Sequence, residues 1–154
     1  MLSWIRRRMS TEGGNAAVEL AMMLPLFLAL VMGIIEFGRV LYFKQVITNA
    51  ARESSRASAT GFEPYITAAN RVLSPAGIPT PYPACSTSPS QGTAAICRTI
   101  VNIPVSAANT QAHRVAISYN AAFITPLGAL LDLIVGNAGL ASGITQSSTA
   151  VMRQ

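Results

Sequence analysis

The sequence contains few charged residues. Only 11% of its 154 residues are Asp, Glu, Lys or Arg, whereas 51% are hydrophobic. Typical soluble domains carry about 25% charged residues, so an ordinary soluble globule is disfavoured. The high apolar content also excludes a disordered chain, which combines low hydrophobicity with many charges. A segment embedded in lipid explains both features.

Aromatic residues are scarce as well, at 6%, although the formal net charge is +5. Nucleic-acid-binding domains place their basic residues in a stripe or patch interleaved with aromatic residues. Here the basic residues flank the most apolar stretch instead. They are Arg6, Arg7 and Arg8 before it, and Arg39, Lys44, Arg52 and Arg56 after it. This pattern is typical of a membrane-flanking region, and we expect no nucleic-acid partner.

Cysteine and histidine are too few for the common zinc sites. The chain has two cysteines, Cys85 and Cys97, one histidine, His113, and no CxxC motif. An isolated cysteine pair in a Pro/Ser/Thr-rich stretch favours one disulfide in an oxidising compartment, worth about 3 kcal/mol. The alternative is two free thiols in a cytosolic loop. We expect His113 at the surface or in a turn.

No catalytic constellation is evident. The many serines lack a nucleophile elbow and a recognisable base, so no triad can be assembled. The sequence also lacks a P-loop and a dinucleotide-binding fingerprint. We therefore expect a protein that is not an enzyme and that holds no cofactor and no metal.

An apolar stretch at residues 16–35 contains one charged residue, Glu19, near its start. With a rise of about 1.5 Å per residue, a helix over this stretch is roughly 30 Å long, which matches the bilayer core. A cleaved secretory signal is disfavoured because the stretch is too long and no small-x-small site follows it.

The helical pattern continues beyond this stretch. Val40, Phe43, Ile47 and Ala50 recur at spacings of three and four, which predicts an apolar stripe. We expect one helix from about residue 15 to about residue 58, kinked at Pro25 within the membrane and ended by Gly61.

The remainder predicts a small domain. A short helix is expected at 64–73 with Pro64 at its first position, followed by a loop at 74–97. Alternating apolar residues predict strands at 101–105 and 115–119, and a third strand is expected at 145–152. Pro104 predicts an edge strand or a bulge.

The apolar residues 121–141 are interrupted by Pro126, three glycines and Asp132. A second membrane span is possible there, but the central acid would cost about 2.5–3.5 kcal/mol. We favour a short, partly buried helix packed on the sheet.

These elements predict an α+β fold, with a long N-terminal transmembrane helix followed by a small antiparallel-sheet domain. The expected divisions are a leader at 1–14, the transmembrane half of the helix at 15–36, its extramembrane continuation at 37–61 and an α+β domain at 62–154.

The strongest motif opens the apolar stretch. Residues 14–19, GNAAVE, follow a short basic leader. The arrangement resembles the processing site of type IV-like prepilins, in which a basic leader and a glycine precede the cut and a glutamate is the fifth mature residue. Cleavage after Gly14 makes Asn15 the first residue and Glu19 the fifth.

The resemblance extends to about residues 13–56. Glu19-Leu20, LPL around Pro25, GIIEFGR at 33–39 and AAR at 50–52 resemble the TadE-like pseudopilins, minor components of the Tad (tight adherence, Flp-type) pilus system. The resemblance implies a protein that helps to initiate, cap or prime a pilus, or supports its secretion. The implied partners are a prepilin peptidase, other Tad pseudopilins or the major pilin, and the inner-membrane pilus assembly platform.

The charge of Glu19 gives this motif a physical explanation. A carboxylate in an apolar stretch is costly unless it is paired. Cleavage would create an α-amine on Asn15, about 6 Å from Glu19 along the helix axis. A neighbouring subunit displaced by that distance would bring its amine level with Glu19, and pairing would set the assembly register. The alternative is an interfacial acid favoured by the helix dipole.

Glu36 and Arg39 are three residues apart and can pair on one helix face. We interpret them as an interfacial ion pair that closes the span, with Arg39 snorkelling towards water. A specific contact with a partner is the alternative.

The orientation does not follow from charge, because three basic residues lie near each end of the span. The prepilin resemblance and the cysteine pair place the N-terminus in the cytoplasm and the C-terminal domain in the periplasm, as a single-pass protein of the bacterial inner membrane. Entry into the pilus itself is left open. The rival hypothesis is an uncleaved single-pass membrane protein with an extracytoplasmic binding domain unrelated to pili.

Overall fold

The computed structural model describes residues 11–83, 85, 88–105, 108–126, 128, 129, 132, 136 and 143–153. The chain divides into two compact units, unit 1 at Met1–Ile35 and unit 2 at Glu36–Gln154. The first ten residues of the predicted leader, and most of the predicted helix within 126–141, lie outside the described residues.

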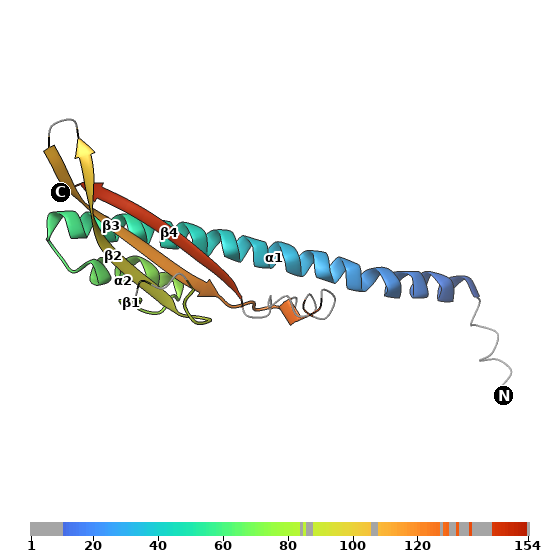
Figure 1. Ribbon diagram of the computed structural model, residues 1–154. Coiled ribbons are helices and arrows are strands. Elements are labelled where there is room, and N and C mark those ends of the chain that lie inside the picture. The colour runs from blue at the N-terminus through green and yellow to red at the C-terminus, as the bar shows by residue number, and fades with distance from the viewer. Residues whose placement is uncertain are drawn as a thin grey trace. The chain divides into compact units, whose positions relative to one another are not determined.

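The long helix α1, Thr11–Thr60, confirms the helix predicted from the sequence (Figure 1). It continues on both sides of Pro25 as one α-helix. Gly61 ends it with a φ of +66°, and the Gly61 N–H donates to the Ala57 carbonyl at 3.0 Å. This left-handed conformation suits glycine because a Cβ would clash with the neighbouring carbonyl.

Helix α2, Tyr65–Leu73, follows and runs into a 3₁₀ turn, η2, at Ser74–Ala76. The predicted helix was placed correctly, but Pro64 is its N-cap and not its first helical residue. The ψ of Pro64 is 133°, so its backbone is extended, while its carbonyl already accepts from the Ala68 N–H at 3.2 Å.

Four strands form one sheet in the order β1-β2-β3-β4. Their bounds are β1 Tyr82–Pro83, β2 Ala94–Val105, β3 Ala108–Ala121 and β4 Ile144–Arg153. Strands β2, β3 and β4 are antiparallel, whereas β1 pairs in parallel with β2. The sheet is therefore mixed. The prediction of a loop throughout residues 74–97 is also wrong, because this stretch contains β1 and the start of β2.

Pro104 lies in β2 opposite Asn109 of β3, and the register of the two strands is continuous, without a bulge. On its other side β2 pairs with β1 only at Ala95 and Ile96. Among the described residues, Pro104 therefore faces no strand on that side, which is where a residue without an N–H is tolerated.

The core of unit 2 lies between one face of the sheet and the two helices, which Figure 1 shows running alongside the strands. From α1 it takes Ile47, Ala50 and Ala51, from α2 Leu73, and from the sheet Ile96, Val115, Ile117 and Tyr119. The predicted stripe of α1 is this buried face, since Phe43 packs edge-on against Tyr119 with ring centroids 5.2 Å apart.

His113 is buried in β3, with 7% of its surface exposed, so the prediction of a surface or turn residue is wrong. Its position explains the difference. His113 is two residues before Val115 and four before Ile117, and alternate residues of a strand share one face. Extending the alternation by one step would have placed it in the core.

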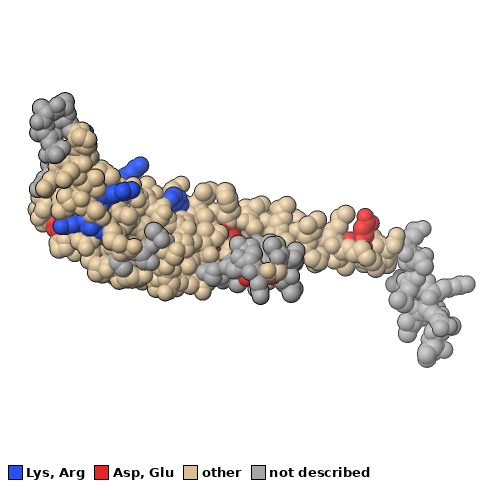
Figure 2. Space-filling model, in the orientation of Figure 1, with Lys and Arg blue, Asp and Glu red and all other residues tan. Residues whose placement is uncertain are grey.

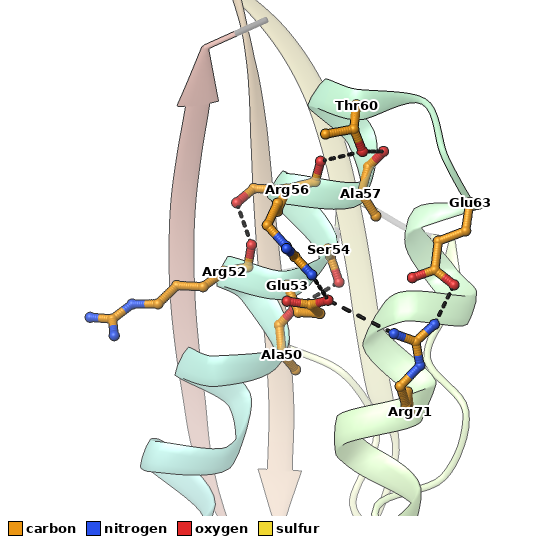
Figure 3. Close-up of polar contacts among 10 residues, drawn as sticks. Ala50, Arg52, Glu53, Ser54, Arg56, Ala57, Thr60, Glu63 and Arg71 are labelled. Atoms are coloured by element: carbon orange, nitrogen blue, oxygen red, sulfur yellow. Dashed lines mark hydrogen bonds and ion pairs between the residues drawn. The ribbon is translucent and has the colours of Figure 1, made fainter.

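Most of the Lys and Arg side chains visible on unit 2 gather towards the end where α1 finishes (Figure 2). There, α1 and α2 are joined by ion pairs (Figure 3). Arg71 of α2 lies 3.9 Å from the Glu53 carboxylate and also pairs with Glu63. Arg56 donates to Glu53 at 2.8 Å, and this hydrogen bond holds the pKa of the Glu53 carboxyl below its ordinary value, against the opposing effect of burial.

Gly143, which precedes β4, is required by a close backbone approach. Its φ is +91°, and a Cβ there would lie 2.5 Å from the Ala121 carbonyl oxygen. Gly92 also has a positive φ, +74°, but with open space around it.

We expect Gly92→Ala to lose about 1–2 kcal/mol of unfolding free energy from backbone strain alone. Gly143→Ala should lose more, because it adds the overlap with Ala121. Chemical denaturation of the full chain in detergent measures both, and equal losses would contradict the close-approach argument.

Candidate processing site and helix-anchoring site

Gly14, Asn15 and Glu19 lie in the first turns of α1 and are exposed. The space around Gly14 is open, with no atom within 4 Å of an added Cβ. Asn15 and Glu19 are four residues apart, so they lie on one helix face. Among the described residues, no side chain or backbone group contacts the Glu19 carboxylate. The described part of the chain therefore provides the predicted spacing of this site but no partner for its acid.

The most apolar part of α1 is not buried by the rest of the protein. Among the residues that the structure describes, one helix, Gly14–Thr60, is long and apolar enough to cross a membrane, and its most apolar window is entirely unburied. Large apolar side chains such as Leu20, Met22, Leu26 and Phe27 are exposed along it. The core helix of a soluble protein would bury such residues, so their exposure fits a helix whose solvent is lipid.

Unit 2 begins at Glu36, whose carboxylate is buried, with 5% of the residue exposed. Its Oε1 accepts the backbone N–H groups of Ile124 and Thr125, each at 2.8 Å. Its Oε2 accepts from the Arg39 guanidinium at 2.9 Å. Three donors therefore satisfy the carboxylate and fasten the segment that follows β3 to the helix.

Arg39 completes this anchoring site. Its Nη1 also donates to the Ala122 carbonyl at 3.4 Å, and its guanidinium lies 5.4 Å from the centroid of the Phe43 ring. The structure thus brings Glu36 and Arg39 together as the spacing predicted. Their setting differs from an interfacial pair open to water, because both side chains are partly or fully enclosed by unit 2.

The contacts of Glu36 with Ile124 and Thr125, which lie more than 80 residues away along the chain, were not predicted from the sequence. One signal was present. Glu36 is in phase with Val40, Phe43 and Ile47 at spacings of four, three and four, so it belongs to the stripe that faces the core. A carboxylate on a core-facing stripe must find donors in the domain.

Two further contacts hold β4 on α1. The Gln146 side-chain amide donates to the Val40 carbonyl at 2.9 Å, and the Lys44 ammonium donates to the Ser147 carbonyl. Together with the Glu36 site, they attach both ends of the β3–β4 connection to the same two turns of α1.

Cys85 and Cys97 are joined by a disulfide, with their Cα atoms 4.6 Å apart. Cys97 lies in β2, and Cys85 follows β1. The bond therefore ties the short parallel strand to the sheet, where β1 has only two paired positions of its own.

These features define the class of the protein. A bare apolar helix near the N-terminus precedes a small α+β unit, and this combination fits a membrane-anchored protein. A family model described as TadE-like protein matches residues 14–56. The match confirms the resemblance found in the sequence and covers less than a third of the chain. No curated protein and no solved structure matches the chain significantly.

The anchoring site predicts a large effect of Glu36. We expect Glu36→Ala to lower the unfolding free energy by about 3–5 kcal/mol, because it leaves Arg39 and two backbone N–H groups without their acceptor. Glu36→Gln should lose less, because its amide oxygen can still accept from the backbone. The matched control is Glu53→Ala, which removes another glutamate of α1 that pairs three residues ahead but is partly exposed. It should cost less than about 1 kcal/mol. Similar losses in Glu36→Ala and Glu53→Ala would contradict the anchoring role.

Proposed function

We propose that this chain is a pseudopilin that is cut between Gly14 and Asn15 by a prepilin peptidase and then acts in the assembly of a Tad pilus or of its secretion machinery. The observation that carries the proposal is the register of Gly14 and Glu19 at the start of an exposed apolar helix, inside the segment matched by the TadE-like family. Chance alone would not be expected to place an acid in an apolar stretch five residues after a glycine that follows a basic leader.

The proposed topology follows from the peptidase, which acts on the cytoplasmic side of the membrane. The leader with Arg6, Arg7 and Arg8 is cytoplasmic, and unit 2 is periplasmic. The Cys85–Cys97 disulfide supports this orientation, because disulfides persist in the periplasm and are rare in the cytosol.

Glu19 is the proposed assembly residue. It has no partner among the described residues of its own chain, and in a bilayer its charge is costly until it is neutralised. Cleavage supplies a complementary group, the new α-amine of Asn15. In one chain the two groups are separated by about 6 Å along the helix axis. A neighbouring helix shifted by that distance pairs its amine with Glu19.

The proposed partners are other Tad pseudopilins or the major pilin, which supply the neighbouring helix, and the inner-membrane assembly platform. The role is structural, and no catalytic step is assigned to this chain. Whether the protein initiates, caps or primes the filament depends on its neighbours. The rival hypothesis is an uncleaved single-pass membrane protein with a binding domain. The N-terminus of the protein extracted from membranes distinguishes the two hypotheses.

Processing is tested by intact mass. With the peptidase present, the mass should fall by that of residues 1–14, and the new N-terminus should be Asn15. Gly14→Leu should remain full length, because the peptidase reads a small residue before the cut. Gly33→Leu, on the same helix with equally open space around it, should be cut normally. Normal processing of Gly14→Leu would show that the site is wrong, and an intact leader in the wild type would favour the rival.

Assembly is tested by replacing Glu19. We expect Glu19→Ala to be cut and inserted but to fail in co-purification with pilus partners and in piliation. Losing one member of a buried ion pair costs about 3–5 kcal/mol, which is on the order of a hundredfold or more in the assembly equilibrium. Glu19→Gln should be intermediate, because it keeps an acceptor without the charge. Leu20→Ala, the adjacent exposed position, should assemble normally. Wild-type behaviour of Glu19→Ala would rule out the pairing mechanism.

A further inference from the structure

We infer that the segment just after β3, centred on Ile124, is a second membrane contact, which lies on the bilayer surface beside the end of the spanning helix. Ile124 inserts at the level of the lipid headgroups and the first acyl carbons. The inference rests on the membrane-anchored state of the proposed function, but not on its cleavage or assembly steps.

The Glu36 contacts fix the height of this segment. In the sequence, Glu36 directly follows Ile35, where the uncharged stretch ends, so Glu36 marks where the helix leaves the bilayer core. The Glu36 carboxylate binds the backbone N–H of Ile124 at 2.8 Å. The backbone of Ile124 is therefore held level with that boundary.

Most of Ile124 is left uncovered by the protein. Its surface is 73% exposed, which is unusual for a large aliphatic side chain whose own backbone is anchored by a buried carboxylate. The next turns of α1 are apolar on the outside as well, where Phe37, Leu41 and Tyr42 are all about half exposed or more. Tyr42 lies about 9 Å beyond Glu36 along the axis, within the interfacial region where tyrosine is enriched.

Three backbone groups of the segment are hydrogen-bonded to side chains of α1, whereas the buried Thr125 hydroxyl has no partner among the described residues. Backbone groups enter a water-poor region only when they are hydrogen-bonded. The N–H groups of Ile124 and Thr125 bond to Glu36, and the Ala122 carbonyl accepts from Arg39. These three groups would lose no hydrogen bonds to water when the loop presents Ile124 to lipid.

The distribution of charge favours lipid over a protein partner. On the face drawn in Figure 2, the Lys and Arg side chains of unit 2 gather away from the end where unit 2 begins. Within unit 2, exposed apolar residues begin directly after Glu36 with Phe37 and recur at Leu41 and Tyr42, as a surface at the edge of a bilayer requires. Lys44, two residues after Tyr42, is exposed, and although its ammonium donates to the Ser147 carbonyl, its remaining N–H groups can meet headgroup phosphates.

The test uses single-tryptophan variants of the full chain. Because Trp4 is the only tryptophan, Trp4→Phe gives a silent background. Into it we place Ile124→Trp, Phe37→Trp as the reference at the end of the span, and Phe62→Trp as the control. Phe62 is 91% exposed and follows the far end of α1, so its surroundings should be aqueous. Each variant is reconstituted in phosphatidylcholine vesicles with acyl chains brominated near the headgroup or near the bilayer centre.

We expect the emission of Ile124→Trp to be blue-shifted and strongly quenched by the shallow bromines, less by the deep ones, while Phe62→Trp stays unquenched. Quenching of Phe37→Trp with water-like, unquenched emission of Ile124→Trp would overturn the inference and leave the membrane anchor intact. If the emission of Ile124→Trp then shifted to the blue only on adding a partner pseudopilin, the occupant of this surface would be protein. Absence of quenching in both Phe37→Trp and Ile124→Trp would overturn the anchor and the inference together.

Discussion

The Glu36 carboxylate accepts three hydrogen bonds at the point where α1 stops facing lipid and begins to face its own domain. A buried carboxylate is tolerated only when its lone pairs are filled, and here two of the donors are backbone N–H groups of the segment after β3. The position of that segment therefore depends on the charge. β4 follows the same connection and is fastened about one turn further along α1 by the bond of Gln146 to Val40, and about two turns further along by Lys44.

The same helix meets two solvents, and its sequence changes accordingly. In unit 1 most of the large apolar residues that the structure describes are exposed, as in a helix that faces lipid, and only Val31 and Met32 of them are partly covered. In unit 2 they narrow to a stripe in which Ile47, Ala50 and Ala51 are fully buried. The alanines leave room for Ile117 and Val115 of the sheet to approach the helix, and longer side chains there would hold the two layers apart.

Local patterns were sufficient for the elements with a strong period. The continuation of α1 beyond the apolar stretch and the strand around Val115 follow from spacing. The position of α2 was predicted from Pro64, and the last strand was predicted from its composition rich in Ser, Thr and Val. The start of β2 was missed because Ala94 and Ala95 give weak strand signals and follow a proline-rich stretch. The parallel pairing of β1 was missed because two residues, Tyr82 and Pro83, carry no period at all. His113 was misplaced because its polarity was given more weight than its phase.

In the candidate sites too, local contacts could be predicted from the sequence and contacts made by the tertiary fold could not. The pairing of Glu36 with Arg39 was predictable because it is local, whereas its bonds to Ile124 and Thr125 depend on the tertiary fold. The roles of Gly14, Asn15 and Glu19 stay predictions for a different reason. Their chemistry requires a peptidase and a neighbouring subunit, so one folded chain contains only their spacing.

Glu19 and Glu36 lie on one helix at either end of the same apolar stretch, and they face the same physical problem. A carboxylate near lipid must find donors or remain hydrated at the interface. Glu36 finds its donors within the chain, so its charge is committed to folding, and no neighbour can use it without opening unit 2. Glu19 finds none among the described residues, so its charge remains available to another molecule. In the assembly proposed above, this division of the two acids would separate folding from assembly. Glu36 would serve the folding of unit 2 on a single chain, and the cost of Glu19 would fall when a cleaved neighbour pairs with it in register.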